Sequence, residues 1–198
     1  MTILKVVCAW CGKDLGEKDG QGTEGISHGI CKDCLAKQLA NRVKISTIHP
    51  CLVMVPDERL RQPSEEVIAG EDLTGLVELM KEVLTACKKA GIQTVSIAAP
   101  QVGIMKRLFI IDSPALELVA VNPVVTKAIG KQVNAEGCLS FPVGQYYRVE
   151  RANIVKFRYK DIKGVIRSAK YHDLYAAGVL HEIDHLDGIL MDDRGLPY

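Results

Sequence analysis

The chain has 198 residues, 47% of them hydrophobic, which suffices for one ordinary domain with a packed core plus a small module. Its 25 basic and 24 acidic residues nearly balance, so no overall field recruits nucleic acid or an anionic membrane. No apolar run approaches the ~20 residues of a membrane-spanning helix. No secretory signal precedes the first cysteines, so we expect a cytoplasmic protein with reduced thiols.

Two Cys-x-x-Cys pairs lie in the first forty residues, with residues 12–30 between them. The four cysteines are Cys8, Cys11, Cys31 and Cys34. This spacing is typical of a zinc site closed by four thiolates, and the intervening stretch is too polar to form a core without an ion. We therefore predict a zinc-ribbon-like module over residues 1–43 that holds one structural Zn²⁺. A disulfide pair and a redox-active pair are the alternatives, and neither fits well in a chain that looks cytosolic, where thiols stay reduced.

From residue 44 onward the pattern indicates a helix followed by short strands. Apolar residues recur at helical spacing over 73–90, and Gly91 ends this pattern. Strands bounded by Gly, Pro or Asp are predicted at 95–98, 107–112, 116–121, 153–159 and 165–170. Residues 161–164 are the predicted hairpin turn between the last two. This order predicts an α+β domain, with short mixed or antiparallel sheets packed around a C-terminal helix.

That final helix carries the pattern His-Glu-x-x-His. Asp173 is its predicted N-cap, and Gly188 offers a stop. His181 and His185 are one turn apart on the same face, so both imidazoles can reach one metal ion. Glu182 lies about 100° around the helix, where it can act as general base on a metal-bound water without binding the metal.

An upstream thiolate completes a three-ligand set. Cys138 lies in the stretch Glu-Gly-Cys-Leu-Ser at 136–140, and three ligands leave one position open for water. Histidines four apart can also pack or cap a helix, and a lone cysteine is most often a small buried hydrophobe. The position of His-Glu-x-x-His in mid-helix favours the metal site, and such a site performs metal-assisted hydrolysis.

Three stretches in this order resemble the signature motifs of the peptide deformylases: IAAPQ at 97–101, EGCLS at 136–140 and HEIDH at 181–185. Asp-Glu-Arg-Leu-Arg at 57–61 and Asn-Pro at 122–123 also resemble that family. The resemblance implies a deformylase-like catalytic domain over residues 44–198. Its activity would be hydrolysis of the N-formyl group from N-terminal formylmethionine of nascent polypeptides, with release of formate.

The resemblance also implies roles for individual residues. Cys138, His181 and His185 would hold one catalytic divalent metal, Fe²⁺ in the cell, with Zn²⁺ or Ni²⁺ able to replace it. Glu182 would be the acid/base.

The oxyanion would be stabilised by the Gln101 side-chain amide and the Leu139 backbone N–H. Donors fixed where charge develops are expected on physical grounds, and one is commonly worth about 3 kcal/mol. The expected substrate cleft is lined by Thr94, Ser96, Ile97, Glu136 and Gly137.

The chain departs from the family pattern at two places. Thr94 and Ser96 stand where the first motif normally carries glycines, and alternate residues of a strand share one face, so both would crowd the same side of the cleft. Harmless drift and altered specificity are both consistent with this. After EGCLS, Arg148 and Arg151 are candidates for an arginine that orients the peptide.

Two other functions remain open. One is a different HExxH hydrolase of internal amides, although no Glu or His follows His185 as a downstream third ligand. The other is a non-catalytic or specificity-altered metal-binding adaptor, and the retention of Glu182 with Gln101 argues against a decayed site. The expected partners are a formylated nascent peptide and, through the N-terminal module, the ribosome or another protein. Neither a membrane nor direct nucleic-acid contact is expected.

Overall fold

In a computed structural model of the chain, the structure describes residues 3–8, 11, 13–19, 25–29, 32–33 and 48–198. The chain divides into two compact units, Met1–Lys44 and Ile45–Tyr198. Within the described ranges, no helix combines the length and the apolar character needed to cross a membrane.

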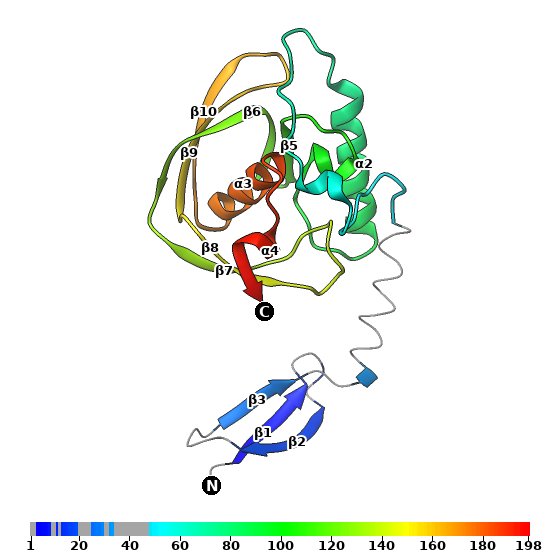
Figure 1. The fold of residues 1–198 in the computed structure, drawn as a ribbon, viewed down its shortest axis with the longest axis vertical. Helices are drawn as coiled ribbons and strands as arrows, with labels where there is room; N and C mark the ends of the chain where they lie inside the picture. Colours follow the sequence, from blue (N-terminus) through cyan, green and yellow to red (C-terminus); the bar gives the residue numbers. More distant parts are fainter. Residues whose placement is uncertain (1–2, 9–10, 12, 20–24, 30–31, 34–47) are drawn as a thin grey trace. The chain divides into compact units, whose positions relative to one another are not determined.

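The first unit contains a three-stranded sheet in the order β2-β1-β3 (Figure 1). The central strand β1 (Ile3–Cys8) pairs antiparallel with β2 (Asp14–Asp19) and parallel with β3 (Gly25–Gly29). Lys5 on β1 forms an exposed ion pair with Asp14 on β2, at 3.3 Å between Nζ and Oδ2. These strands were not predicted from the sequence, because the apolar alternation in them is short and interrupted by polar residues.

The cysteines of this unit are only partly described. Cys8 ends β1, and Cys11 lies in the exposed turn that follows. Cys31 and Cys34 lie outside the described residues, so the four-thiolate zinc site stays a prediction.

The second unit contains two antiparallel sheets. The larger has the order β10-β9-β6-β5-β4 and the smaller β11-β8-β7. The larger sheet consists of β4 (Ser96–Ala98), β5 (Leu108–Ser113), β6 (Leu116–Ile129), β9 (Ile154–Lys160) and β10 (Ile166–His172). The smaller sheet consists of β7 (Gln132–Glu136), β8 (Tyr147–Arg151) and β11 (Gly195–Pro197).

Two long helices pack against these sheets. They are α2 (Thr74–Lys89) and α3 (Asp173–Leu186). The described part of the unit also contains three short helices: η1 (Glu58–Arg61), η2 (Ala99–Val102) and α4 (Met191–Arg194). Figure 1 shows α3 inside the curve of the sheets and α2 outside it. These elements confirm the predicted α+β class and the predicted helix over 73–90. The predicted hairpin turn at 161–164 is also confirmed, because the Gly164 N–H donates to the Asp161 carbonyl at 2.8 Å.

Strand β5 separates two of the three apolar clusters in the described part of the second unit. Leu108 and Ile110 pack in the cluster that contains the buried face of α2, and Phe109 and Ile111 pack in the cluster that contains α3. Successive strand residues point to opposite faces, so β5 is apolar at four consecutive positions. Each of these burials contributes roughly 1.5–3 kcal/mol. This two-sided burial fixes the position of α3, which carries the candidate site.

Strand β6 runs further than predicted. The sequence predicted an end at Val121, before Asn122-Pro123, but the strand continues to Ile129. Asn122 has φ of 49° at a shift in register, and its side chain exchanges two hydrogen bonds of 2.9 Å with the backbone of Val67. A bulge accommodates the proline, and beyond it β6 pairs with β9.

The predicted N-cap of the final helix is wrong. Asp173 is the first residue of α3 rather than its cap, with φ of 49°, and its N–H donates to the Asn153 carbonyl at 2.8 Å. The N-cap position belongs to His172, whose side chain makes no capping bond. At the other end the helix stops as predicted, and Gly188 has φ of 72°.

Candidate metal centre

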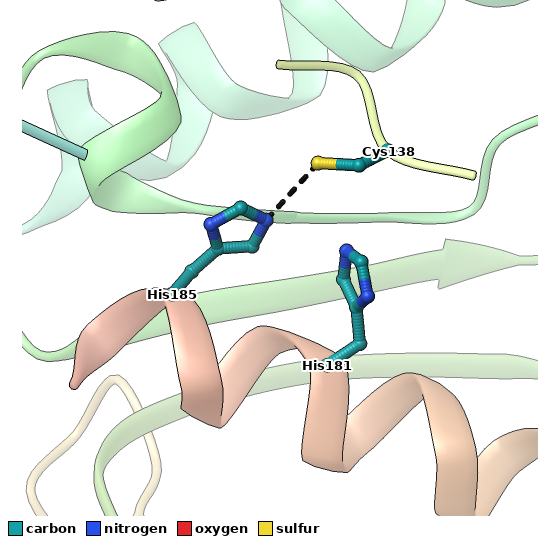
Figure 2. Close-up of side chains that lie close together, drawn as sticks. All are labelled: Cys138, His181 and His185. Carbon is teal, nitrogen blue, oxygen red and sulfur yellow. Dashed lines mark hydrogen bonds between the residues drawn. The ribbon is translucent and has the colours of Figure 1, made fainter. Parts of the chain in front are cut away.

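The three predicted ligands come together in the second unit. His181 and His185 project from one face of α3 toward Cys138, which lies in the loop after β7 (Figure 2). The Cys138 Sγ lies 3.2 Å from Nε2 of His185, and one ligand atom from each of the three residues lies within 4.8 Å of the others. The two imidazole rings are edge to face, with centroids 5.0 Å apart.

The chemistry of this donor set fits a divalent transition metal. One thiolate and two imidazoles suit Zn²⁺ or Fe²⁺, and three protein ligands leave a coordination position open. Burial, together with the nearby charges of His181 and Arg151, lowers the pKa of His185 and favours the neutral imidazole that binds metals. Burial alone would lower the pKa of His181, but contacts with Cys138 and Glu136 outweigh it and raise that pKa, so metal binding and protonation compete at this side chain.

Glu136 orients His181. Its Oε2 lies 2.9 Å from Nδ1 of His181, and it accepts hydrogen bonds from Nε and Nη2 of Arg151 at 2.8 and 2.9 Å. Burial alone would raise the pKa of Glu136, but the hydrogen bonds from Arg151 and His181 bring it down to about 2. The carboxylate therefore engages Nδ1 and leaves Nε2 of His181 to bind a metal.

Arg151 lies beneath the ligands and joins β8 to α3. It is 6% exposed and bonds Glu136 on one side and Asp184 on the other. Arg194 also bonds Asp184, at 2.6 Å between Nη2 and Oδ1. Because Arg151 is held in this network, it is not available to orient a peptide, whereas Arg148 is exposed.

This network was not predicted from the sequence. The sequence feature that could have revealed the network is the alternation over 147–151, which places Arg151 on the same buried face of β8 as Tyr147 and Val149. An arginine on an apolar face needs a buried carboxylate partner.

Glu182 is a buried carboxylate with one oxygen engaged. It is 2% exposed, and Oε1 accepts a hydrogen bond of 2.7 Å from Oγ of Ser96. Its Oε2 is buried and has no hydrogen-bond partner in the described part of the chain. Burial raises the pKa of Glu182, as expected for a carboxylate that must take and return a proton.

The two predicted oxyanion donors lie beside Cys138. The Ala98 N–H donates to Oε1 of Gln101 at 2.9 Å, which turns Nε2 toward Sγ of Cys138 at 3.4 Å and Oγ of Ser140 at 3.2 Å. Leu139 follows Cys138 in the loop, and among residues 48–198 no acceptor lies opposite its N–H. The Gln101 amide is thus oriented without substrate, and the Leu139 N–H is left without a partner in the described part of the chain.

A cavity of about 180 Å³ opens over these groups. It is lined by Thr94, Ser96, Gln101, Asn134, Ala135, Glu136, Gly137, Cys138, Leu139, Leu174, Ala177, Gly178, His181 and Glu182. Four of the five cleft candidates are on this wall, but the Ile97 side chain is completely buried in the core that contains α2. On α3, Leu174, Ala177 and Gly178 also line this cavity, which the sequence did not predict. A second cavity of about 380 Å³ shares Thr94 and 137–139 with the first.

Known proteins are similar to this chain in sequence and in fold. Residues 51–196 match the model of the family described as polypeptide deformylase. The peptide deformylase of Clostridium botulinum strain Alaska E43 is 44% identical over 138 residues, which is 70% of this chain and 90% of that protein.

Solved structures agree with the sequence match. The crystal structure of Thermotoga maritima peptide deformylase gives a TM-score of 0.65 at 28% identity and covers 74% of this chain and 97% of that one. The enzyme from Synechococcus elongatus, solved in complex with actinonin, gives a TM-score of 0.64 at 37% identity over 73% of this chain and 77% of that one. The resemblance drawn from the three motifs is confirmed, and deformylation of nascent peptides is the activity of this family. The chain belongs to the polypeptide deformylase family.

Proposed function

We propose that the cluster of Cys138, His181, His185 and Glu182 removes the formyl group from N-terminal formylmethionine of nascent polypeptides. The observation that carries this assignment is the convergence of three metal-binding side chains beside a buried carboxylate whose Oε2 has no partner in the described residues. An enzyme that acts on nascent chains would work where those chains are made, which supports the proposal of a cytoplasmic protein.

A divalent metal held by Cys138, His181 and His185 would lower the pKa of a water and polarise the formyl oxygen. Fe²⁺ is our proposal for the metal in the cell, with Zn²⁺ or Ni²⁺ as substitutes. The thiolate among the ligands makes the metal a softer Lewis acid than three imidazoles would.

Glu182 moves the proton. Its Oε2 accepts a proton from the water as the water oxygen bonds to the formyl carbon. The carbon–nitrogen bond then breaks, and the same proton passes to the departing amine nitrogen. The products are formate and a free amino terminus, with no other reactant consumed.

Gln101 and Leu139 hold the negative oxygen that forms on the formyl carbon. The Gln101 Nε2 faces the cluster because the Ala98 N–H fixes its Oε1. The Leu139 N–H comes from the loop that carries Cys138. Each such donor is worth roughly 3 kcal/mol in the transition state.

We also propose that Cys8, Cys11, Cys31 and Cys34 hold a structural Zn²⁺ in the N-terminal unit, and that this unit docks the ribosome or another protein. A closed four-thiolate site has no open position for water, so its binding energy contributes to folding rather than to chemistry.

The test combines metal analysis with formate release. Iron-loaded protein, purified without oxygen, should release formate from a formyl-Met peptide and leave an acetyl-Met peptide intact. A His181→Ala, His185→Ala variant should lose one metal per chain and retain the metal of the N-terminal unit. Wild-type metal content in that variant would exclude these histidines as ligands.

A further inference from the structure

Ser96 makes the one hydrogen bond that the described residues offer to the carboxylate of Glu182. Its Oγ donates to Oε1 at 2.7 Å, from the first residue of β4 to the middle of α3. A glycine at this position could not make this contact, because it has no hydroxyl.

The donor is held by a rigid strand. Ser96 pairs with Ile111 across β4 and β5, and the next two residues, Ile97 and Ala98, are completely buried on opposite faces of the sheet. A hydrogen-bonding group on a packed strand keeps its position better than one on a loop. The acceptor is equally confined, because Glu182 is 2% exposed.

The contact distinguishes the two oxygens of Glu182. Oε1 is engaged by Ser96, whereas Oε2 is buried and without a partner within the described ranges. Rotation about the last side-chain bond of a glutamate is broad and roughly two-fold, so an unrestrained carboxylate samples many orientations. One short hydrogen bond to a charged acceptor is strong enough to select one of them.

We propose that Ser96 is a positioning residue for catalysis: its hydroxyl holds Oε1 of Glu182 so that Oε2 alone exchanges the proton. The proposal rests on the proposed function of Glu182 as the acid/base. It differs from a simple narrowing of the cleft, which would act on substrate binding instead.

The kinetic test compares Ser96→Ala, Ser96→Gly and Ser96→Thr in the full-length, metal-loaded protein with formyl-Met peptides. Removal of the hydroxyl should lower kcat about 10-fold, while KM and metal content change less than about twofold. Ser96→Thr keeps the hydroxyl and should stay within about threefold of the parent. Ser64→Ala is the matched control, because Ser64 is 8% exposed and its Oγ has no hydrogen-bond partner among residues 48–198.

Two results would overturn the proposal. Ala and Gly variants with the parental kcat would show that the hydroxyl is not used. A lower KM in Ser96→Gly, with unchanged kcat, would show that Ser96 only narrows the cleft.

A crystallographic test separates this proposal from the proposed function. Crystal structures of the full chain and of Ser96→Ala should show one conformer of Glu182 in the parent and a rotated or divided carboxylate in the variant. An unchanged single conformer in the variant contradicts the positioning role. This readout needs no turnover, so a wild-type protein that released no formate would exclude the proposed function and leave the contact of Ser96 with Glu182 still measurable.

Discussion

Three buried charged side chains, Glu136, Arg151 and Asp184, form a network behind the candidate metal ligands, and the exposed Arg194 pairs with Asp184 at its edge. Taking charges out of water is costly, and the buried charges of this network are compensated by their neighbours. This network fixes His181 from behind, while Ser96 fixes Glu182 from the side of β4. The reactive groups are thus positioned by different elements, and single substitutions can separate their roles.

Glu182→Gln tests the proton transfer. Glutamine has nearly the same shape but cannot accept the proton, so deformylation should fall by on the order of 10² or more while the metal stays bound. Formate release is measured together with metal content. Unchanged turnover at full metal occupancy would exclude Glu182 as the base.

Glu136→Gln tests the support of His181. Removing the negative charge weakens the hydrogen bond to Nδ1 of His181 and leaves the positive charge of Arg151 less compensated. Metal affinity should therefore fall about 10- to 100-fold. Competition with a chelator measures this affinity. Glu150→Gln is the control, since Glu150 pairs with Lys131 on the surface at 2.8 Å and is exposed. Equal affinities in the two variants would show that Glu136 does not orient the ligand.

The lowered pKa of Glu136 also predicts a pH dependence of stability. Its pKa falls from 4.5 to about 2 on folding, so its contribution to stability is complete above pH 4.5 and is lost as the pH falls through 2. In metal-free protein, the difference in unfolding free energy between the parent and Glu136→Gln should shrink over this interval. A difference that does not change with pH would contradict the lowered pKa.

At the scale of elements, α3 contributes side chains both to the apolar core and to the candidate site. Val179, Ile183 and Leu186 pack in the core beneath the sheet, while His181 and Glu182 face the cavity. The end of the helix is tied to the segment after η1, where the Ser64 N–H donates to the Leu186 carbonyl at 2.8 Å. The turn at Gly188 makes this close approach feasible.

Gly188→Ala should therefore destabilise the domain. Gly188 has φ of +72°, and a Cβ there would lie 2.7 Å from the backbone carbon and oxygen of Arg61. Left-handed strain of about 1 kcal/mol and overpacking of about 1–3 kcal/mol act together. Gly164→Ala is the control, because Gly164 has φ of +79° and no heavy atom within 4 Å, so only the strain of about 1 kcal/mol remains. Urea denaturation measures both, and equal losses would show that the segment near Arg61 moves aside freely.

At the scale of the whole molecule, the family match begins at residue 51, and the N-terminal unit lies outside it. The proposed four-thiolate site would stabilise that unit by itself. The candidate metal centre, its supporting charges and its cavity all consist of residues from the second unit. We therefore expect the two units to be separable.

Deletion of residues 1–43 should leave a folded domain whose kcat on a short formyl-Met peptide is within a few-fold of the parent. Circular dichroism and thermal melting check the fold, and formate release checks the activity. A truncated protein that binds iron normally but loses activity by orders of magnitude would show that the N-terminal unit shapes the cleft. The docking role would then be wrong.

Much of the site chemistry is local in sequence and could be predicted from it. His181 and His185 share a face because a helix has 3.6 residues per turn, and Gly164 closes a hairpin because its neighbours fix the turn. Such features depend on spacing along one segment, which the sequence states directly. Cys138 was predicted as the third ligand because its thiolate can complete the set, and the resemblance to the deformylases implied the same role.

Only the tertiary structure decided the contacts between distant segments. The bond from Ser96 to Glu182 and the link of Arg151 to Asp184 exist because α3 packs between β4 and β8, and no periodicity within either segment encodes that packing. The bulge at Asn122 likewise depends on a partner at Val67. The sequence by itself determined which groups can bind a metal and move a proton. Burial, which depends on the packing of the whole domain, decided how those groups are oriented and which of their atoms remain free to react.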